Sequence, residues 1–244
     1  MKNITNLFYK MFTETQLTEI RNYLLSKKLP IDILIEVNDH FVSQISDLQR
    51  EENLSFEEAF EKTKLSWDKE LKPYYHGDWD LEDKSKLLRT INRNNFYSLA
   101  KKSLLYTMSI ILALIFLSLI LKFEIYKYVF VTTIWIVISN PLINYFRKRA
   151  DLDLHKKYTK YILISIQEYT MLSIGGIYFY IKFLLEGFYV AEMFKDFIYL
   201  QNFENFIFGL FITFTLLSVS FLSIFSQKIY LTKIEKVKPF LKYL

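Results

Sequence analysis

Three long stretches of this chain carry no charged residue, and a fourth carries a single acid. They cover about residues 103–121, 128–146 and 205–227, and 161–181 with Glu168 inside it. A helix needs about 20 mostly apolar residues to cross the hydrocarbon core of a bilayer, where every backbone polar group must be paired within the segment. The pattern therefore predicts four transmembrane helices.

Basic residues flank these four segments unevenly. Seventeen Lys and Arg residues lie close to the spans on one side, in residues 84–102, 147–160 and 228–244, whereas the other two connections hold four. Lys and Arg close to the ends of spans favour the cytoplasmic side of a membrane. We therefore expect a multi-pass protein of the cytoplasmic (inner) membrane, with both termini in the cytoplasm.

The region before the first segment has a different composition. Residues 1–100 carry a net charge of −3, whereas residues 101–244 carry +8. Thr13 with Gln16, and Ser55 with Glu58, have the spacing of a capping box at a helix start. Apolar residues recur at helical spacing after each box and after Pro30. We expect an all-α fold, in which a small cytoplasmic three-helix module (1–80) precedes a four-span transmembrane bundle (103–227).

Two basic segments border the expected bundle. Residues 81–102 predict an amphipathic juxtamembrane helix with Lys86, Arg89 and Arg93 on one face, and residues 228–244 form a basic cytoplasmic tail. Basic amphipathic segments next to a span bind anionic lipid headgroups. We favour lipid over nucleic acid as the partner, because the membrane is adjacent and no recognised nucleic-acid-binding pattern accompanies the charges.

Two segments of the expected module resemble a known domain type. Residues 31–45 and 54–67 are similar to the small helical domain that precedes membrane spans in bacterial proteins of the permease-prefix and HAAS (helix-turn-helix-associated signalling) type. The matching positions are Glu36, Asp39, His40, Ser55, Glu57, Glu58, Ala59 and Phe60. The resemblance implies a cytoplasmic regulatory or interaction module, in families linked to transcriptional regulators or ABC-type permeases. The chain departs from those permeases because it has no ATP-binding motif and no large extracellular domain.

Glu168 is the one acid inside an expected span. An ionisable group at that depth costs at least a few kcal/mol unless it faces protein or water. It is therefore either a proton- or cation-responsive group or a carboxyl that hydrogen-bonds a neighbouring span. Asn140 and Asn144, near the cytoplasmic end of the second span, lie at a similar depth and are candidates to bind it. Pro141 between them is either a packing kink or a gate.

Glu36, Asp39 and His40 form a second candidate site, for an interaction or a sensor. A His that titrates near pH 6.5 can sense pH, and three such residues can supply metal ligands. Nothing else in the sequence completes a metal shell, so we expect no metal or other cofactor and favour a structural role for His40, bridging helices through its ring nitrogens.

No recognised catalytic motif occurs in the chain, including HExxH, GxSxG and the nucleotide-binding GxxxxGK[ST]. We therefore expect a non-enzymatic accessory or regulatory membrane protein, whose partner is another membrane or regulatory protein or a second copy of itself. The alternative is a small oligomeric ion or solute carrier in which Glu168 is the coupling group.

Overall fold

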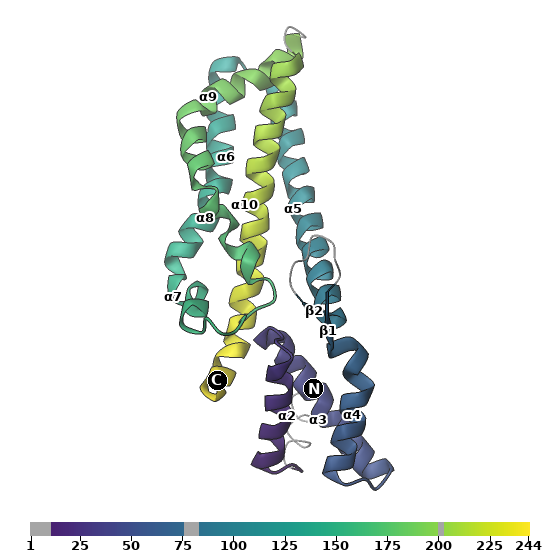
Figure 1. Ribbon diagram of the computed structural model, residues 1–244. Coiled ribbons are helices and arrows are strands. Elements are labelled where there is room, and N and C mark those ends of the chain that lie inside the picture. The colour runs from purple at the N-terminus through teal and green to yellow at the C-terminus, as the bar shows by residue number, and fades with distance from the viewer. Residues whose placement is uncertain (1–10, 76–82, 200–202) are drawn as a thin grey trace. The chain divides into compact units, whose positions relative to one another are not determined.

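The structure, a computed structural model, describes residues 11–75, 83–199 and 203–244 (Figure 1). Within these ranges nearly all regular structure is helical, apart from one antiparallel pair of two-residue strands, β1 (Pro73–Tyr74) and β2 (Lys84–Ser85). The all-α fold class expected from the sequence is confirmed.

The chain divides into two compact units, each built from segments that are distant in the sequence. The first unit comprises Met1–Asn94, His155–Ser165 and Lys233–Leu244, and the second comprises Asn95–Leu154 and Ile166–Thr232. The N-terminal helices therefore share their unit with an internal connecting segment and with the C-terminal end of the chain.

Both capping boxes read from the sequence are formed in the first unit. The Thr13 hydroxyl accepts from the amide of Gln16, and the Gln16 side chain accepts from the amide of Thr13. Ser55 and Glu58 make the same reciprocal pair. Each box satisfies amides that the first helical turn leaves without partners. The main helices of this unit are α2 (Glu14–Ser26), α3 (Ile31–Glu51) and α4 (Phe56–Leu71), and it also holds η3 (Lys238–Tyr243).

An aromatic core joins α2, α3 and α4. The Phe41 and Trp67 ring centroids lie 5.4 Å apart, and the Tyr23 and Phe60 rings pack edge to face at 5.8 Å. The indole nitrogen of Trp67 donates to the side-chain oxygen of Gln44 at 2.9 Å, which pairs the one polar group of that ring. Fully buried aliphatic side chains complete this core: Ile20, Leu24, Leu34, Ile45 and Leu71.

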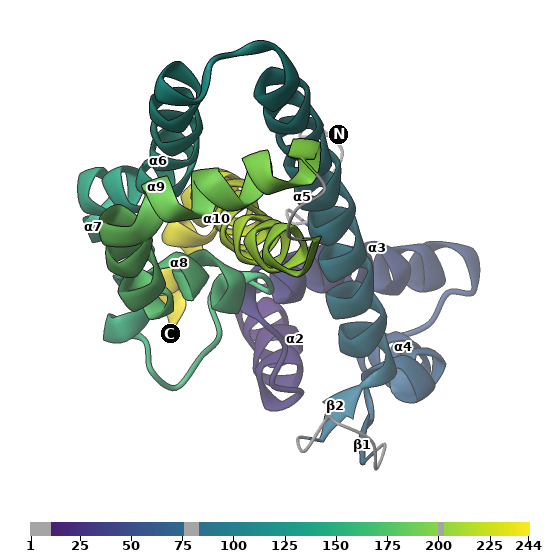
Figure 2. The same cartoon turned by 90° about the horizontal axis from the view of Figure 1, so that it is seen from above.

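Four long helices build most of the second unit, which Figure 2 shows from above. On α6, four buried side chains recur at every fourth residue: Tyr126, Phe130, Ile134 and Ile138. Residues at this spacing share one helix face, so α6 presents a continuous apolar stripe to the core. The long helices are α5 (Lys86–Ile120), α6 (Phe123–Arg147), α9 (Ile177–Tyr199) and α10 (Phe203–Val237), and the short ones are α7 (Arg149–Leu152), η2 (Gln167–Met171) and α8 (Leu172–Gly175). The first turns of α5 and the last turn of α10 belong to the first unit, as does most of the short helix η1 (Leu154–Lys157).

Small hydroxyl side chains join α10 to its neighbours. The Ser103 hydroxyl of α5 donates to the carbonyl of Ser218 at 2.6 Å, and the Tyr180 hydroxyl of α9 lies 3.2 Å from that of Ser220. Small polar residues of this kind allow close approach of helices in lipid. Ser218 and Ser220 of the last apolar segment therefore take part in contacts between helices.

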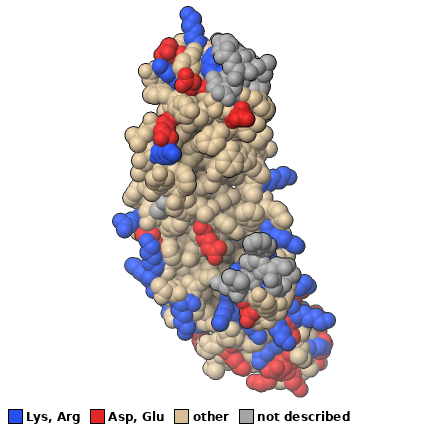
Figure 3. Space-filling model, turned by 45° about the horizontal axis from the view of Figure 1, so that its top comes forward, with Lys and Arg blue, Asp and Glu red and all other residues tan. Residues whose placement is uncertain are grey.

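Among the described residues, three helices are long and apolar enough to cross a membrane: α5, α6 and α10 with its continuation to Tyr243. Much of the surface over these helices is free of Lys, Arg, Asp and Glu in the view of Figure 3. α6 continues through Pro141 to Arg147.

The predicted third span, residues 161–181, is wrong as a single helix. Residues 161–165 are not helical, because the carbonyls of Ile162 and Leu163 accept the first two amides of α3. Helical structure then resumes in the short η2 and α8, and the long helix α9 begins only at Ile177. α9 is long enough to cross a membrane, but it carries five charged residues.

Two further boundaries differ from the sequence-based expectation. Residues 183–199 belong to the expected connection between the third and fourth spans (161–181 and 205–227), but they lie within α9 and contribute to the core of the second unit. The expected juxtamembrane helix 81–102 is not separate from the first span, because α5 runs without interruption from Lys86 to Ile120; residues 81 and 82 lie outside the described ranges. Residues 86–120 contain no Gly or Pro that would end the helix.

Removal of the Ser55–Glu58 capping box should lower the stability of the chain by a measurable amount. We expect Ser55→Ala to lower the free energy of unfolding of the full chain in detergent by about 1 kcal/mol, the usual value of such a cap. Thr18→Ala, at an exposed helical position of α2, is the control and should change stability little. Urea titration followed by circular dichroism measures both, and equal stability of the two variants would contradict the assignment.

The same capping box should contribute less to the stability of the chain as the pH falls. The Ser55 amide, followed by its hydroxyl, donates to the Glu58 carboxylate and lowers the pKa of Glu58 below its ordinary value. A carboxyl whose pKa is lower in the folded state stabilises the fold at every pH above its pKa in the unfolded chain. This contribution is lost as the pH falls through the pKa of the folded state. The stability difference between the native chain and Glu58→Gln should therefore shrink in acid.

Candidate functional site

Two of the three residues expected to form an interaction or sensor site are exposed on α3. Glu36 and His40 lie one turn apart and face outward, whereas Asp39 is half-buried. The His40 ring lies 6.4 Å from that of Trp67 on α4. Among residues 11–75, 83–199 and 203–244, no group of three or more His, Asp or Glu side chains is placed to hold a metal ion.

Glu168 lies outside the long helices. It is the second residue of the 3-10 helix η2, and its side chain is exposed. The expected hydrogen bond between Glu168 and the amide of Asn144 is replaced, because the Asn144 side chain donates to Gln227 at 2.8 Å. Asn140 and Asn144 instead line a small depression beside α10, together with Lys228.

Gln227 is a buried polar residue that the sequence reading did not select. Its side-chain oxygen accepts from Asn144, and its side-chain nitrogen donates to the carbonyls of Pro141 at 3.2 Å and Thr170 at 3.1 Å. The side chain is fully buried, so these bonds satisfy groups that would otherwise be costly to desolvate. One amide of α10 thus joins α6 to the segment before α9.

Asp32 is the second residue missed from the sequence, and it organises the first unit. Its side chain is 5% exposed and lies 2.7 Å from the ammonium group of Lys233, at the start of the C-terminal segment of this unit. One carboxylate oxygen accepts from the Ser165 amide at 2.9 Å, and the other accepts from the Ser165 hydroxyl at 2.9 Å. A buried charge is stable only when it is paired and hydrogen-bonded in this way.

The backbone completes the same arrangement. Pro30 stands at the N-cap position of α3 and supplies no side-chain oxygen to the first turn. The amides of Ile31 and Asp32 donate instead to the carbonyls of Ile162, at 2.9 Å, and Leu163, at 3.1 Å. Segments separated by more than 100 residues thus exchange hydrogen bonds in both directions. From the sequence, Asp32 is an ordinary helix-start acid, and nothing local indicates Ser165 or Lys233 as partners.

The basic face expected on residues 81–102 is partly used within the protein. The Lys86 ammonium group pairs with Glu70 at 2.7 Å, and the Arg89 guanidinium donates to the carbonyl of Tyr74 at 2.7 Å. Arg93 is exposed, as are Lys101 and Lys102 further along α5.

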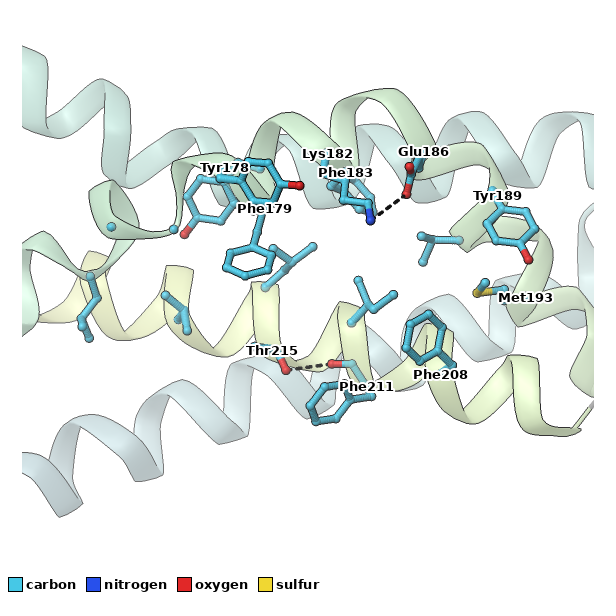
Figure 4. Close-up of a pocket in the computed structure, with 18 of the residues that line it drawn as sticks. Tyr178, Phe179, Lys182, Phe183, Glu186, Tyr189, Met193, Phe208, Phe211 and Thr215 are labelled. Carbon is cyan, nitrogen blue, oxygen red and sulfur yellow. Dashed lines mark hydrogen bonds and ion pairs between the residues drawn. The ribbon is translucent and has the colours of Figure 1, made fainter.

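An apolar groove lies between α9 and α10 in the second unit (Figure 4). It encloses about 810 Å³, within the range of ligand and side-chain pockets. Phe179 and Phe208 are among the aromatic side chains that line it, and Glu168 lies at its border. The Lys182 ammonium group and the Glu186 carboxylate, 3.8 Å apart on α9, form the ion pair in this groove.

Comparisons of the chain with protein-family models, with curated proteins and with solved structures found no match. The resemblance of residues 31–45 and 54–67 to permease-prefix and HAAS domains therefore stays a prediction.

If Asp32 and Lys233 pair as observed, substitutions of the two residues should have non-additive effects on the free energy of unfolding. Asp32→Ala should destabilise the full chain by about 2–4 kcal/mol, because it leaves the Lys233 charge and the Ser165 amide and hydroxyl without their acceptor. Lys233→Met should cost less, because Ser165 still pairs with Asp32. A double-mutant cycle of these two variants, measured by chemical unfolding in detergent, should give a coupling of about 1–3 kcal/mol. Additive effects would contradict the pairing.

Removal of the Gln227 side-chain amide should destabilise the second unit. Gln227→Leu keeps the size of the side chain but leaves the Asn144 amide without its acceptor, so we expect a loss of about 1–3 kcal/mol. Thr215→Val is the matched control, since the Thr215 hydroxyl donates only to the Phe211 carbonyl of its own helix. Thermal unfolding in detergent should separate the two variants; a smaller loss for Gln227→Leu than for the control would refute the assigned role.

Proposed function

We propose that this chain is a non-enzymatic accessory or regulatory protein of a bacterial cytoplasmic (inner) membrane. In this proposal the helices α2, α3 and α4 form a cytoplasmic interaction module, and α5, α6, α9 and α10 form a four-helix membrane domain. Binding of a regulatory or membrane protein to the module is coupled to the membrane helices.

The observation that carries the proposal is the buried carboxylate of Asp32. It pairs with Lys233, in the last part of α10, and with Ser165, which ends the segment that leads to η2 and α9. A ligand that moves α3 must therefore strain or break charged hydrogen bonds to both segments. In this proposal the bonds are formed in one state and broken in the other, which couples binding at α3 to both segments.

The candidate interaction residues lie on the same helix as this carboxylate. Asp32, Glu36 and His40 follow one another at four-residue steps along α3, so they share one side of the helix. Asp32 is buried at the start of α3, whereas Glu36 and His40 are exposed in the next two turns. We propose that the partner binds at Glu36 and His40 and acts on Asp32 through the rigid helix.

The membrane placement is supported by helix length and flanking charge. α5, α6 and α10 have the length and composition of spans, and α9 packs against α6 along the aromatic pairs Tyr128–Phe188 and Phe130–Phe194. Four crossings put both chain ends on the side where the Lys and Arg residues concentrate. Arg93, Lys101 and Lys102 are the side chains that we propose for contact with anionic headgroups, because Lys86 and Arg89 are engaged within the protein.

A pull-down with the full chain tests this function. The tagged protein is extracted in mild detergent, and everything that co-purifies is identified for the native chain and for Glu36→Lys/His40→Ala. The control is Glu14→Lys, an exposed acid-to-lysine change at the start of α2. We expect a stoichiometric partner that is reduced about tenfold or more by the α3 variant and retained by the control. The same set of proteins with all three chains would argue against an interaction site on α3.

A further inference from the structure

α9 carries two apolar seams on different sides, and only one of them is covered. Five of its buried residues follow one another at alternating steps of three and four: Tyr180, Phe183, Gly187, Val190 and Phe194. A second series with steps of four, three and four is exposed, and it consists of Tyr178, Lys182, Leu185 and Tyr189. Leu185, at 78% exposure, is the most exposed of these apolar side chains. This spacing is that of a helix-pairing seam.

Lys182, a member of the exposed seam, forms an ion pair with Glu186 of the same helix. Lys182 and Glu186 are each about half-exposed, at 54% and 55%. Lys195, near the other end of α9, donates to the carbonyl of Leu121 at the end of α5. Lys182 precedes it by 13 residues, about 20 Å along the helix. If α9 crosses the bilayer, as proposed above, the pair therefore faces the hydrocarbon interior, where ionisable groups require protein or water as neighbours.

The groove beside this seam is lined mainly by apolar side chains. Thr215, which lines it, donates to the Phe211 carbonyl of its own helix. Phe179, Phe208 and Phe211 contribute aromatic surface to the same hollow (Figure 4). A lipid chain would fill the apolar space but leave both charges in hydrocarbon. An occupant that fits must bring apolar side chains and a complementary pair of charges together.

We propose that the occupant is a second copy of this chain, which pairs through the exposed seam of α9. Two copies in one membrane, related by a two-fold axis along its normal, present the same residues at the same depth. The two Lys182 side chains then lie at one level and the two Glu186 side chains at the next, about 6 Å along the axis, so each Lys182 meets Glu186 of the partner subunit diagonally across the interface. A lysine side chain spans that distance, so the two intrahelical pairs become one alternating network of four charges. The apolar seam residues close over it.

Charge reversal distinguishes this dimer from an isolated ion pair on one helix. Lys182→Glu and Glu186→Lys each destroy the pair within a chain and place like charges across the interface. We expect each variant alone to lose self-association by about tenfold or more. Co-expression of the two, with different tags, should restore association between them, because each copy now complements the other. Undiminished dimers of the single variants, or no recovery on co-expression, would overturn the proposal.

A second measurement uses the natural charges, so it remains decisive if the charge variants do not accumulate. The chain contains no Cys, so a single introduced thiol reports only on its own site. Leu185→Cys should form a disulfide-linked dimer on mild oxidation of native membranes. Ile136→Cys, similarly exposed at 65% on α6, is the control and should stay monomeric. Absence of the Leu185→Cys dimer would overturn the proposal.

The dimer rests on the proposed membrane function, and the two can fail separately. Extraction of the same membranes with alkaline carbonate shows whether the chain is integral to the bilayer. An integral chain without the Leu185→Cys cross-link rejects only the dimer. A chain released by carbonate rejects the membrane placement itself, and the dimer with it.

Discussion

The carboxylate of Asp32 is the interaction on which the first unit depends. Pro30 leaves the start of α3 without a side-chain cap, so its first amides take the carbonyls of Ile162 and Leu163 as acceptors. Asp32 in turn accepts from the amide and hydroxyl of Ser165 and pairs with Lys233. Each of these groups would be costly to bury alone. Together they hold three segments that are far apart in the sequence.

This exchange of hydrogen bonds also explains why the predicted third span is wrong. The apolar composition of residues 161–165 predicts a helix. In the structure the carbonyls of Ile162 and Leu163 accept from amides of α3, and the Ser165 amide donates to Asp32 of α3. The long helix therefore begins later, at Ile177. Glu168 then falls in a short 3-10 helix, and Lys182 and Glu186 fall within a long one. Composition therefore indicates Glu168 as the charged residue of a span, whereas in the structure Lys182 and Glu186 are charged residues that lie within a long helix.

Local patterns predicted the local structure well. The two capping boxes, the helical module and the long apolar helices α6 and α10 follow from signals within a few turns of each helix. The polar contacts between segments could not be predicted in that way. Gln227 reads as the polar end of a span and Asp32 as a helix-start acid, although their partners lie up to 201 residues away. The buried position that makes such residues important is a property of the packing alone.

Residue-resolved hydrogen exchange of the unmodified chain in lipid nanodiscs tests this account most directly. The amides of Ile31, Asp32 and Ser165 precede or lie outside the regular helical ladder, so in an isolated helix start or loop they would exchange rapidly. The account predicts slow exchange at all three, with the protection of the core amides of α3. Rapid exchange at these amides, with the rest of α3 protected, would show that the junction is not formed and would contradict the proposed coupling of α3 to α10 and to the segment before η2.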